Sequence, residues 1–323
     1  MSVVQTQGEY EFYNHAPQQG DIGEEILLGL ALPQKKISPK YFYDAYGSHL
    51  FEQITELEEY YLTRTEMALF DEHLATIGEQ LGNNLCVVEY GSGSSKKIRK
   101  LLETLAPTAY VPVDISEQHL QENAKALHQD FPNLNVYPVC ADITQPFDLP
   151  EEVMDLTKVA FYPGSSIGNF EPELAAEFLT KVRQSVGLGG ILIIGVDRKK
   201  DVAVLEAAYN DKAGVTANFN LNVLSHLNES LNANFDLDQF EHTATYNNQL
   251  GCIQMFLRSL TDQQVQVADT KVSFAKDELI HTENSFKYTP AEVEALCTKV
   301  GFSLSMHFED IQQYFSLYVF EGS

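Results

Sequence analysis

Short apolar runs alternate with amphipathic segments between Leu85 and Val196. Five runs have the length of buried strands: LCVVE, YVPVD, LNVYPVC, KVAFYP and ILIIGVD. The segments between them, such as SKKIRKLLETLA and PELAAEFLTKVRQSVG, repeat their apolar residues at helical spacing. Because parallel strands need long crossover connections, usually helices, this order predicts a doubly wound, Rossmann-like α/β domain.

Further elements are predicted on either side of these runs. Thr63 and Glu66 have capping-box spacing ahead of the apolar-periodic segment MALFDEHLATIGEQL, so we expect a helix to begin at Thr63. Near the C-terminus, AEVEALCTKVGF predicts a helix, and SLSMHF and SLYVFE predict two strands that complete the same sheet.

The pattern changes between Lys199 and Lys287. A long helical stretch, DVAVLEAAYNDKAGVTANFNLNVLSHL, is followed by the alternating segments FEHTATY, CIQMFLRSL, VQVAD and KVSFA. We therefore expect a second, α+β lobe that is inserted into the first domain and packs with the aromatic N-terminal segment. The predicted division assigns residues 61–198 and 287–323 to the Rossmann-like domain, and residues 1–60 and 199–286 to the second lobe.

The net charge of −25 disfavours a nucleic-acid partner, because binding to phosphates requires basic patches. Cations and zwitterions are better candidate ligands, although an acidic surface also serves solubility alone. No apolar run reaches the roughly 18 residues of a membrane helix, and the N-terminus lacks the character of a signal peptide. We therefore expect a cytoplasmic protein that has no membrane partner and works as a monomer.

The cysteines and histidines do not predict a metal site. The histidines form no pair at metal-binding spacing. The four cysteines are widely spaced among apolar neighbours, which predicts reduced thiols in the core: Cys86, Cys140, Cys252 and Cys297.

The turn after the first predicted strand has two close glycines, in the stretch Glu89-Tyr90-Gly91-Ser92-Gly93. A dinucleotide-binding fingerprint would place a third glycine where this chain has Lys96. The loop therefore suits a ligand that needs close approach of the backbone but has no pyrophosphate.

Two aspartates follow the next predicted strands. Asp114 ends YVPVD, at a position where an acidic side chain accepts hydrogen bonds from ribose hydroxyls. Asp142 follows LNVYPVC, where it would meet an adenine amino group. An aspartate after a strand is also a common turn former or helix cap, so each position taken alone has a purely structural explanation.

Seven separated stretches match the motifs of one enzyme family in order: YFYDAYGSHLFEQITELEEYYLTRTE, VEYGSGSSKKIRKLL, YVPVDIS, FYPGSSIGNFEP, AAYNDKAGVTANFNLNVL, IQMFLR and IHTENSFKY. From about Lys40 to the C-terminus, the chain resembles the histidine-specific Nα-methyltransferases of ergothioneine biosynthesis. The resemblance implies a class I methyltransferase domain that uses S-adenosylmethionine (SAM), with a substrate-binding second lobe. It also implies stepwise trimethylation of the α-amino group of L-histidine to hercynine.

The resemblance implies a role for each matching residue. It places the methyl donor against Gly91, Lys97, Asp114, Asp142 and Ile143. Family members often have an aromatic residue where this chain has Ile143, which cannot stack on adenine as a ring does. It places free L-histidine and its mono- and dimethylated forms against Tyr60, Gly164, Asn169, Tyr209, Met255, Glu283 and Ser285, with Tyr43 and Phe51 nearby. Most of these belong to the second lobe and the N-terminal segment, which agrees with a ligand bound between two lobes.

The chemistry fits these residue types. Methyl transfer from a sulfonium is an in-line displacement with an activated leaving group, so the enzyme mainly supplies orientation and no catalytic metal is required. Tyr43 and Tyr60 would position the amine, and their rings, with that of Phe51, suit a quaternary ammonium product.

The polar residues would recognise the carboxylate and the imidazole ring of histidine. Asn169 and Tyr209 can donate hydrogen bonds to the carboxylate. Glu283 and Ser285 are two residues apart in the strand-like stretch HTENSFKY, so they would share a face and hold the two imidazole nitrogens.

Other interpretations stay open from the sequence. The aromatic residues and Met255 are also typical of a hydrophobic core, and Glu283 of an exposed strand. A related enzyme would methylate another amino acid or a biogenic amine. A nucleotide-binding oxidoreductase would need the missing third glycine, and a non-catalytic module would bind the donor without turnover.

Overall fold

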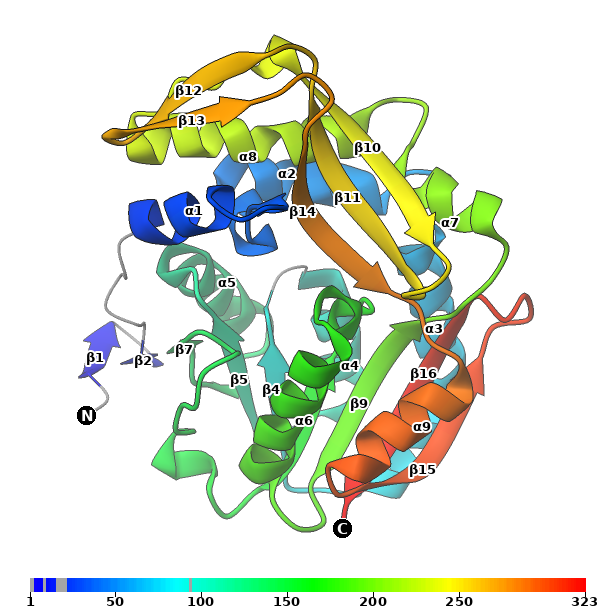
Figure 1. Cartoon of the computed structure of the whole chain (residues 1–323). Helices are drawn as coiled ribbons and strands as arrows, with labels where there is room; N and C mark the ends of the chain where they lie inside the picture. Colours follow the sequence, from blue (N-terminus) through cyan, green and yellow to red (C-terminus); the bar gives the residue numbers. More distant parts are fainter. Residues whose placement is uncertain (1–2, 8–9, 16–21, 93–94) are drawn as a thin grey trace. The chain divides into compact units, whose positions relative to one another are not determined.

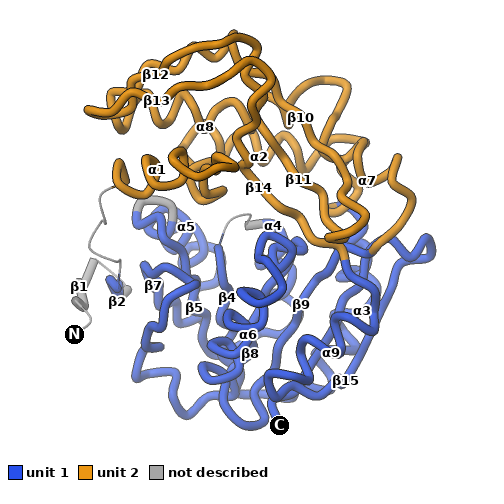
Figure 2. Tube along the Cα trace, viewed as in Figure 1, with its two compact units in different colours: residues 1–18, 64–198, 288–323 blue, residues 19–63, 199–287 orange. Residues whose placement is uncertain are grey.

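The computed structural model describes residues 3–7, 10–15, 22–92 and 95–323. The chain divides into two compact units, coloured separately in Figure 2. Unit 1 comprises Met1–Gln18, Arg64–Arg198 and Tyr288–Ser323, and unit 2 comprises Gln19–Thr63 and Lys199–Lys287.

The division differs from the sequence prediction mainly at the N-terminus. The prediction assigned residues 1–60 to the second lobe, whereas the described part of residues 1–18 belongs to unit 1. The reason is a strand pairing, because β2 (Tyr10–Asn14) lies parallel to β7 (Val139–Cys140). The later boundary also shifts by one residue, which places Lys287 in unit 2.

A largely parallel sheet forms the core of unit 1. Its strand order is β1-β2-β7-β5-β4-β8-β9-β16-β15, with β6 paired to β5. The strands from β2 to β9 run parallel to one another, and β1, β16 and β15 are antiparallel to their neighbours. The remaining bounds are β1 Val3–Gln7, β4 Leu85–Tyr90, β5 Ala109–Asp114, β6 Asn135–Val136, β8 Thr157–Tyr162, β9 Ile191–Asp197, β15 Phe302–Glu309 and β16 Phe315–Gly322.

The central strands of this sheet are mainly apolar and buried along most of their length because helices flank the sheet (Figure 1). Right-handed crossovers that run in opposite directions place helices on opposite faces, so α4 and α5 lie opposite α6. The helices of unit 1 are α3 Tyr61–Leu81, α4 Ser95–Leu105, α5 Glu117–Asp130, α6 Pro172–Val186 and α9 Pro290–Lys299, with short 3-10 helices at η2 Glu151–Val153 and η3 Ser166–Asn169. The predicted Rossmann-like α/β class is confirmed.

The predicted capping box before the first strand is wrong. Helix α3 begins at Tyr61, so Thr63 lies inside it, and Glu66 is fully buried. A capping box exists instead at α9, where the Thr289 hydroxyl accepts from the backbone N–H of Glu292 and the Glu292 carboxylate accepts from that of Thr289. The spacing rule uses only neighbouring residues, so it cannot detect that the Glu66 carboxylate binds groups that are distant in the chain.

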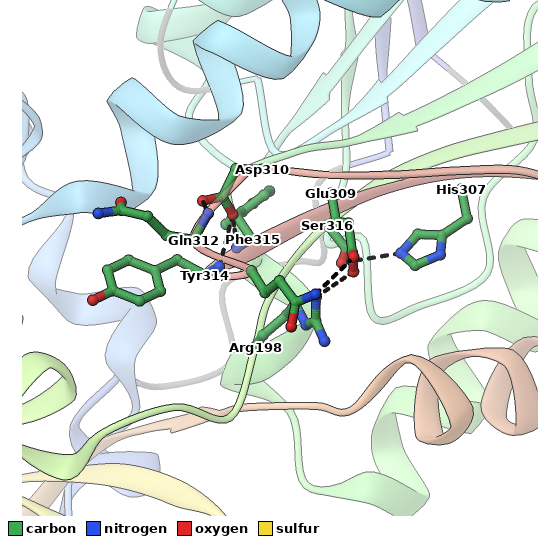
Figure 3. A network of polar contacts seen from close by, with 9 residues as sticks. Arg198, His307, Glu309, Asp310, Gln312, Tyr314, Phe315 and Ser316 are labelled. Atoms are coloured by element: carbon green, nitrogen blue, oxygen red, sulfur yellow. Dashed lines mark hydrogen bonds and ion pairs between the residues drawn. The ribbon is translucent and has the colours of Figure 1, made fainter.

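Polar contacts fix the C-terminal hairpin to the end of β9 (Figure 3). Asp310 accepts from the backbone N–H groups of Gln312, Tyr314 and Phe315, which closes the turn between β15 and β16. Arg198, the last residue of unit 1 before the chain enters unit 2, forms an ion pair with Glu309. At Arg198 the chain therefore leaves unit 1 from an edge that polar contacts hold in place.

Unit 2 contains a mainly antiparallel sheet of strand order β10-β11-β14-β3 and a separate β12–β13 hairpin. Helix α8 packs against β10 and β11, and α2 packs against α8. The bounds are α1 Ile22–Leu30, β3 Lys35–Lys36, η1 Pro39–Phe42, α2 Ala45–Thr55, α7 Val202–Tyr209, α8 Val215–Leu231, η4 Leu237–Gln239, β10 Phe240–Asn247, β11 Cys252–Ser259, β12 Gln263–Val267, β13 Thr270–Phe274 and β14 Leu279–Phe286. The predicted long helical stretch is thus two helices, interrupted near Gly214, whose φ is +74°.

The four cysteines are free and buried, as predicted. In the described ranges, no helix combines the length and the apolarity needed to cross a membrane.

Candidate functional site

The sheet of unit 1 has a topological switch point between β4 and β8. From β4 the chain moves outward to β5 and β7, then returns to β8 beside β4 and continues to β9 on the other side. Ligands of open α/β sheets bind outside the carboxyl ends of the strands at such a point. Gly91 follows β4 and Gly164 follows β8, so both lie at this edge.

Gly91 begins the turn after β4 in a left-handed conformation. Its φ is +77°, and its N–H donates to the carbonyl oxygen of Val113 at 2.8 Å. A Cβ at this position would have no heavy atom of the described residues within 4 Å, so these residues leave space beside the turn. Gly93 lies outside the described residues.

Glu66 joins three segments of unit 1 at the switch point. Its carboxylate accepts from the N–H of Gly164 at 2.8 and 3.0 Å and pairs with Lys97 Nζ at 2.5 Å. Gly195 in β9 makes room for it, because a Cβ there would lie 1.9 Å from Glu66 Oε1. Gly164 has φ +77°, and a Cβ on it would meet Lys97 Nζ at 3.2 Å. The predicted donor residue Lys97 and substrate residue Gly164 are therefore adjacent.

Asp114 and Asp142 each form a turn with one carboxylate oxygen. Oδ1 of Asp114 accepts from the N–H of Ser116 at 2.9 Å, and Oδ1 of Asp142 accepts from that of Thr144 at 2.8 Å. The structural explanation thus applies to both residues. In Asp142 no described residue hydrogen-bonds the second carboxylate oxygen, Oδ2. Ile143, next to Asp142, is half-buried.

Glu89 is buried beneath the glycine turn and hydrogen-bonds the Tyr110 hydroxyl. Burial raises its pKa to about 8, although the Tyr110 hydrogen bond and the charge of Lys97 lower it. At neutral pH this carboxyl is therefore mostly protonated.

The free energy of unfolding is expected to fall as the pH rises from about 5 to about 8. The folded-state pKa of Glu89, about 8, exceeds the unfolded value of 4.5. The stabilisation is therefore complete below the unfolded pKa and is lost as the pH rises through the folded one, at up to about 1.4 kcal/mol per pH unit. Glu89→Gln should flatten this dependence in urea unfolding measured across the range; parallel curves for the two proteins would contradict the assignment.

Aromatic side chains form a continuous cluster in unit 2. The Phe219 ring centroid lies 5.7 Å from Tyr43 and 5.9 Å from Phe51. Phe51 lies 6.4 Å from Tyr60, which lies 6.3 Å from Tyr209. Tyr43 is 45% exposed, whereas Tyr60, Tyr209 and Phe219 are buried. The structure thus brings together the four predicted aromatic residues and adds Phe219.

Local contacts hold this aromatic cluster in place. Asp44 caps α2, because its Oδ1 accepts from the N–H of Gly47 at 2.6 Å. The same oxygen accepts from Asn222 Nδ2 at 2.9 Å, which ties α2 to α8. Tyr43 immediately precedes this cap, Phe51 lies on α2 and Phe219 on α8.

Polar residues meet the end of the aromatic cluster at β14. The Tyr209 hydroxyl lies 2.8 Å from Ser285 Oγ, and Lys287 Nζ donates to both oxygens at 2.9 Å. Glu283 lies two residues before Ser285 in β14, opposite Met255 of β11, and both are buried. Burial raises the pKa of Glu283 to about 7, and the charge of Lys287 opposes that rise.

The predicted substrate residues divide between the units. Tyr43, Phe51, Tyr60, Tyr209, Met255, Glu283 and Ser285 belong to unit 2, whereas Gly164 and Asn169 belong to unit 1. Asn169 ends η3, and no described residue hydrogen-bonds its carboxamide.

Sequence reasoning missed three residues of these groups. Glu66 fitted a capping pattern, and no feature of the predicted helical stretch distinguished Phe219 from its neighbours. Lys287 was detectable, because the strand period of two puts it on the same face as Glu283 and Ser285.

The chain matches a family of known proteins over most of its length. Residues 22–322 match the family described as histidine-specific methyltransferase, SAM-dependent. A histidine N-alpha-methyltransferase from Mycolicibacterium smegmatis is 39% identical over 283 residues, which cover 86% of this chain and 87% of that protein. Ergothioneine biosynthesis protein 1 from Schizosaccharomyces pombe is 27% identical over 86% of this chain and 38% of that longer protein.

A solved structure has the same fold. A SAM-dependent methyltransferase from Clostridium acetobutylicum matches 87% of this chain and 100% of its own with a TM-score of 0.50, at 13% identity. At that identity the likeness supports the fold alone, and the family follows from the match over residues 22–322. This chain belongs to the histidine-specific, SAM-dependent methyltransferases.

Proposed function

We propose that this protein transfers methyl groups from SAM to the α-amino group of L-histidine, three times in succession, and so makes hercynine for ergothioneine biosynthesis. The observation that carries the proposal is a buried carboxyl and a buried hydroxyl, Glu283 and Ser285, on one strand of a member of this family. Such a pair can accept from one imidazole nitrogen and donate to the other.

The residues at the switch point of unit 1 fit the methyl donor. The open space at Gly91 permits close approach of a ligand to the backbone, and Asp142 keeps a carboxylate oxygen that no described residue bonds. Asp114 would hold the ribose hydroxyls and Asp142 the adenine amino group, beside Ile143. Lys97, whose ammonium group pairs with the Glu66 carboxylate, would contact the methyl donor. When bound, SAM supplies a methyl group on a positively charged sulfur.

The chain's own contribution is orientation of the amine. The Tyr43 and Tyr60 hydroxyls would hold the amine with its lone pair toward the incoming methyl group and pass its proton to water. Their rings and that of Phe51 would face the amine as it becomes a quaternary ammonium, an interaction of about 0.5 to 2 kcal/mol for each ring.

The remaining residues would recognise the carboxylate and the imidazole ring of histidine. Asn169 would donate to the carboxylate, whereas the Tyr209 hydroxyl, 2.8 Å from Ser285 Oγ, would act on Ser285 instead. Glu283 and Ser285 would hold the imidazole ring, with Met255 as its apolar neighbour. A site built for such hydrogen bonds rejects analogues without them by roughly 10⁴-fold, because its buried polar groups would be left unpaired.

The test is a mass-resolved assay with purified protein, SAM and L-histidine. Masses that rise by one, two and three methyl groups support the proposal. L-tryptophan and histamine, offered separately, test methylation of another amino acid or a biogenic amine. Donor binding without any product would instead support a non-catalytic module.

Asp114→Ala is expected to raise the dissociation constant for SAM about 10- to 100-fold, because a charged hydrogen-bond partner of the ribose is lost. Isothermal titration calorimetry measures the change. Asp114→Asn is the matched control for the turn, since its side-chain oxygen can still accept from Ser116 N–H. Normal SAM binding by Asp114→Ala would remove this residue from the donor site.

We also propose that the protein is cytoplasmic and monomeric. Light scattering coupled to size-exclusion chromatography tests the second directly.

A further inference from the structure

Lys287 is almost completely buried, with 1% of its surface exposed, and the proposed function leaves it without a role. It follows Glu283 and Ser285 on the same face of the chain, at strand spacing. A lysine in the interior is rare unless its charge is paired and its protons are hydrogen-bonded. Its position beside two predicted substrate residues therefore needs an explanation.

The hydrogen bonds around Lys287 constrain the two neighbouring hydroxyls. An ammonium group has donors but no acceptor, so the oxygens of Tyr209 and Ser285 must both accept from it. These oxygens also lie 2.8 Å apart, so one hydroxyl donates to the other. A serine oxygen has two lone pairs to offer, whereas one lone pair of a phenol is delocalised into its ring. In the favoured arrangement the Tyr209 hydroxyl therefore donates to Ser285 Oγ. The hydroxyl proton of Ser285 then points away from Tyr209 and can be donated to a ligand.

We propose that Lys287 is a positioning residue for substrate recognition: it makes Ser285 a hydrogen-bond donor and holds Glu283 as a carboxylate acceptor. Strand β14 then offers one donor and one acceptor to a neutral ring with two nitrogens, such as imidazole. The inference rests on the proposed function, because it takes L-histidine as the ligand.

The charge of Lys287 matters because Glu283 is buried. Burial raises the pKa of Glu283 to about 7, and the Lys287 charge is the influence that lowers it. Removal of that charge would raise the pKa further, so Glu283 would be protonated at neutral pH and lose its role as an acceptor.

Charged groups on the neighbouring elements are engaged elsewhere. Lys35 of β3 pairs with Glu278 at 2.6 Å, and Glu206 of α7 accepts from the N–H of Tyr246 at 2.9 Å. His281 of β14 contacts Asn284 at 2.8 Å, and Arg258 of β11 pairs with Glu241 and Asp277. On Glu283 itself, Lys287 is the charge that acts.

The experiment measures the dissociation constant of L-histidine between about pH 6 and about pH 9, by calorimetry, for three variants of Lys287. Lys287→Arg keeps the charge, Lys287→Gln keeps a donor without charge, and Lys287→Met keeps neither. Histidine's own titration is common to all the proteins, so a difference between them reports the protein.

We expect the loss of affinity at low pH to begin about one pH unit higher in Lys287→Gln than in the wild type, which makes binding about fivefold weaker near pH 7. Lys287→Arg should restore the wild-type profile. Ser285→Ala should weaken binding at every pH without moving the profile. Lys287→Met should combine both effects; if it fails to fold, the Gln and Arg variants decide the matter.

The outcomes separate this inference from the proposed function. A wild-type protein that neither binds nor methylates histidine contradicts both. A wild type that methylates histidine, together with a Lys287→Gln variant whose pH profile is unchanged, contradicts the Lys287 inference alone.

Discussion

Glu283→Ala is expected to lower kcat/KM for L-histidine by about 10⁴-fold, while SAM binding stays within about twofold of the wild type. The buried carboxyl of Glu283 is the proposed acceptor for one imidazole nitrogen. Its loss leaves that nitrogen without a partner at a buried position, and buried unpaired polar groups are strongly unfavourable. Steady-state kinetics with histidine and calorimetry with SAM measure the two effects.

Two controls make this result specific. Glu283→Gln keeps the volume and an accepting oxygen without the charge, so its loss should be smaller. Glu241→Ala removes a glutamate whose side chain is 54% exposed, in strand β10 of the same sheet, and should leave kcat/KM unchanged. If histidine affinity survives in Glu283→Ala, the imidazole assignment is wrong.

Glu66→Ala is expected to reduce the free energy of unfolding by about 3–5 kcal/mol, because it leaves a largely buried lysine charge without its partner. The carboxylate of Glu66 also accepts from the N–H of Gly164 at 2.8 and 3.0 Å. The same change should weaken SAM binding, since its ion-pair partner Lys97 lies at the proposed donor site. Urea unfolding and SAM titration measure the two effects.

The matched control lies on the same helix. Glu72 is also in α3, but its side chain is 74% exposed, so Glu72→Ala should change the free energy of unfolding by less than about 0.5 kcal/mol. Glu66→Gln should lie between the two, because an amide oxygen still accepts from Gly164 but does not neutralise Lys97. Equal stabilities of Glu66→Ala and Glu72→Ala would show that the buried ion pair is not what holds the switch point together.

The proposed substrate site was partly readable from local rules. Alternation in HTENSFKY put Glu283 and Ser285 on one face, and β14 contains both. The same rule includes Lys287, but a lysine after a strand reads as a solvent-exposed charge until its burial is known. Phe219 likewise gained significance only when its ring was found in contact with those of Tyr43 and Phe51.

The sequence by itself determined the alternation of strands and helices between Leu85 and Val196, the parallel sheet and the turn at Gly91, because hydrophobic periodicity and glycine conformation act over a few residues. Only the tertiary structure decided that Glu66 pairs with Lys97 and accepts from the N–H of Gly164 instead of capping a helix. It also decided that Lys287 donates to both Tyr209 and Ser285. Glu66 and Gly164 are 98 residues apart in the chain, and Tyr209 and Lys287 are 78 apart. Contacts at such separation depend on how whole elements pack, and no local pattern encodes that packing.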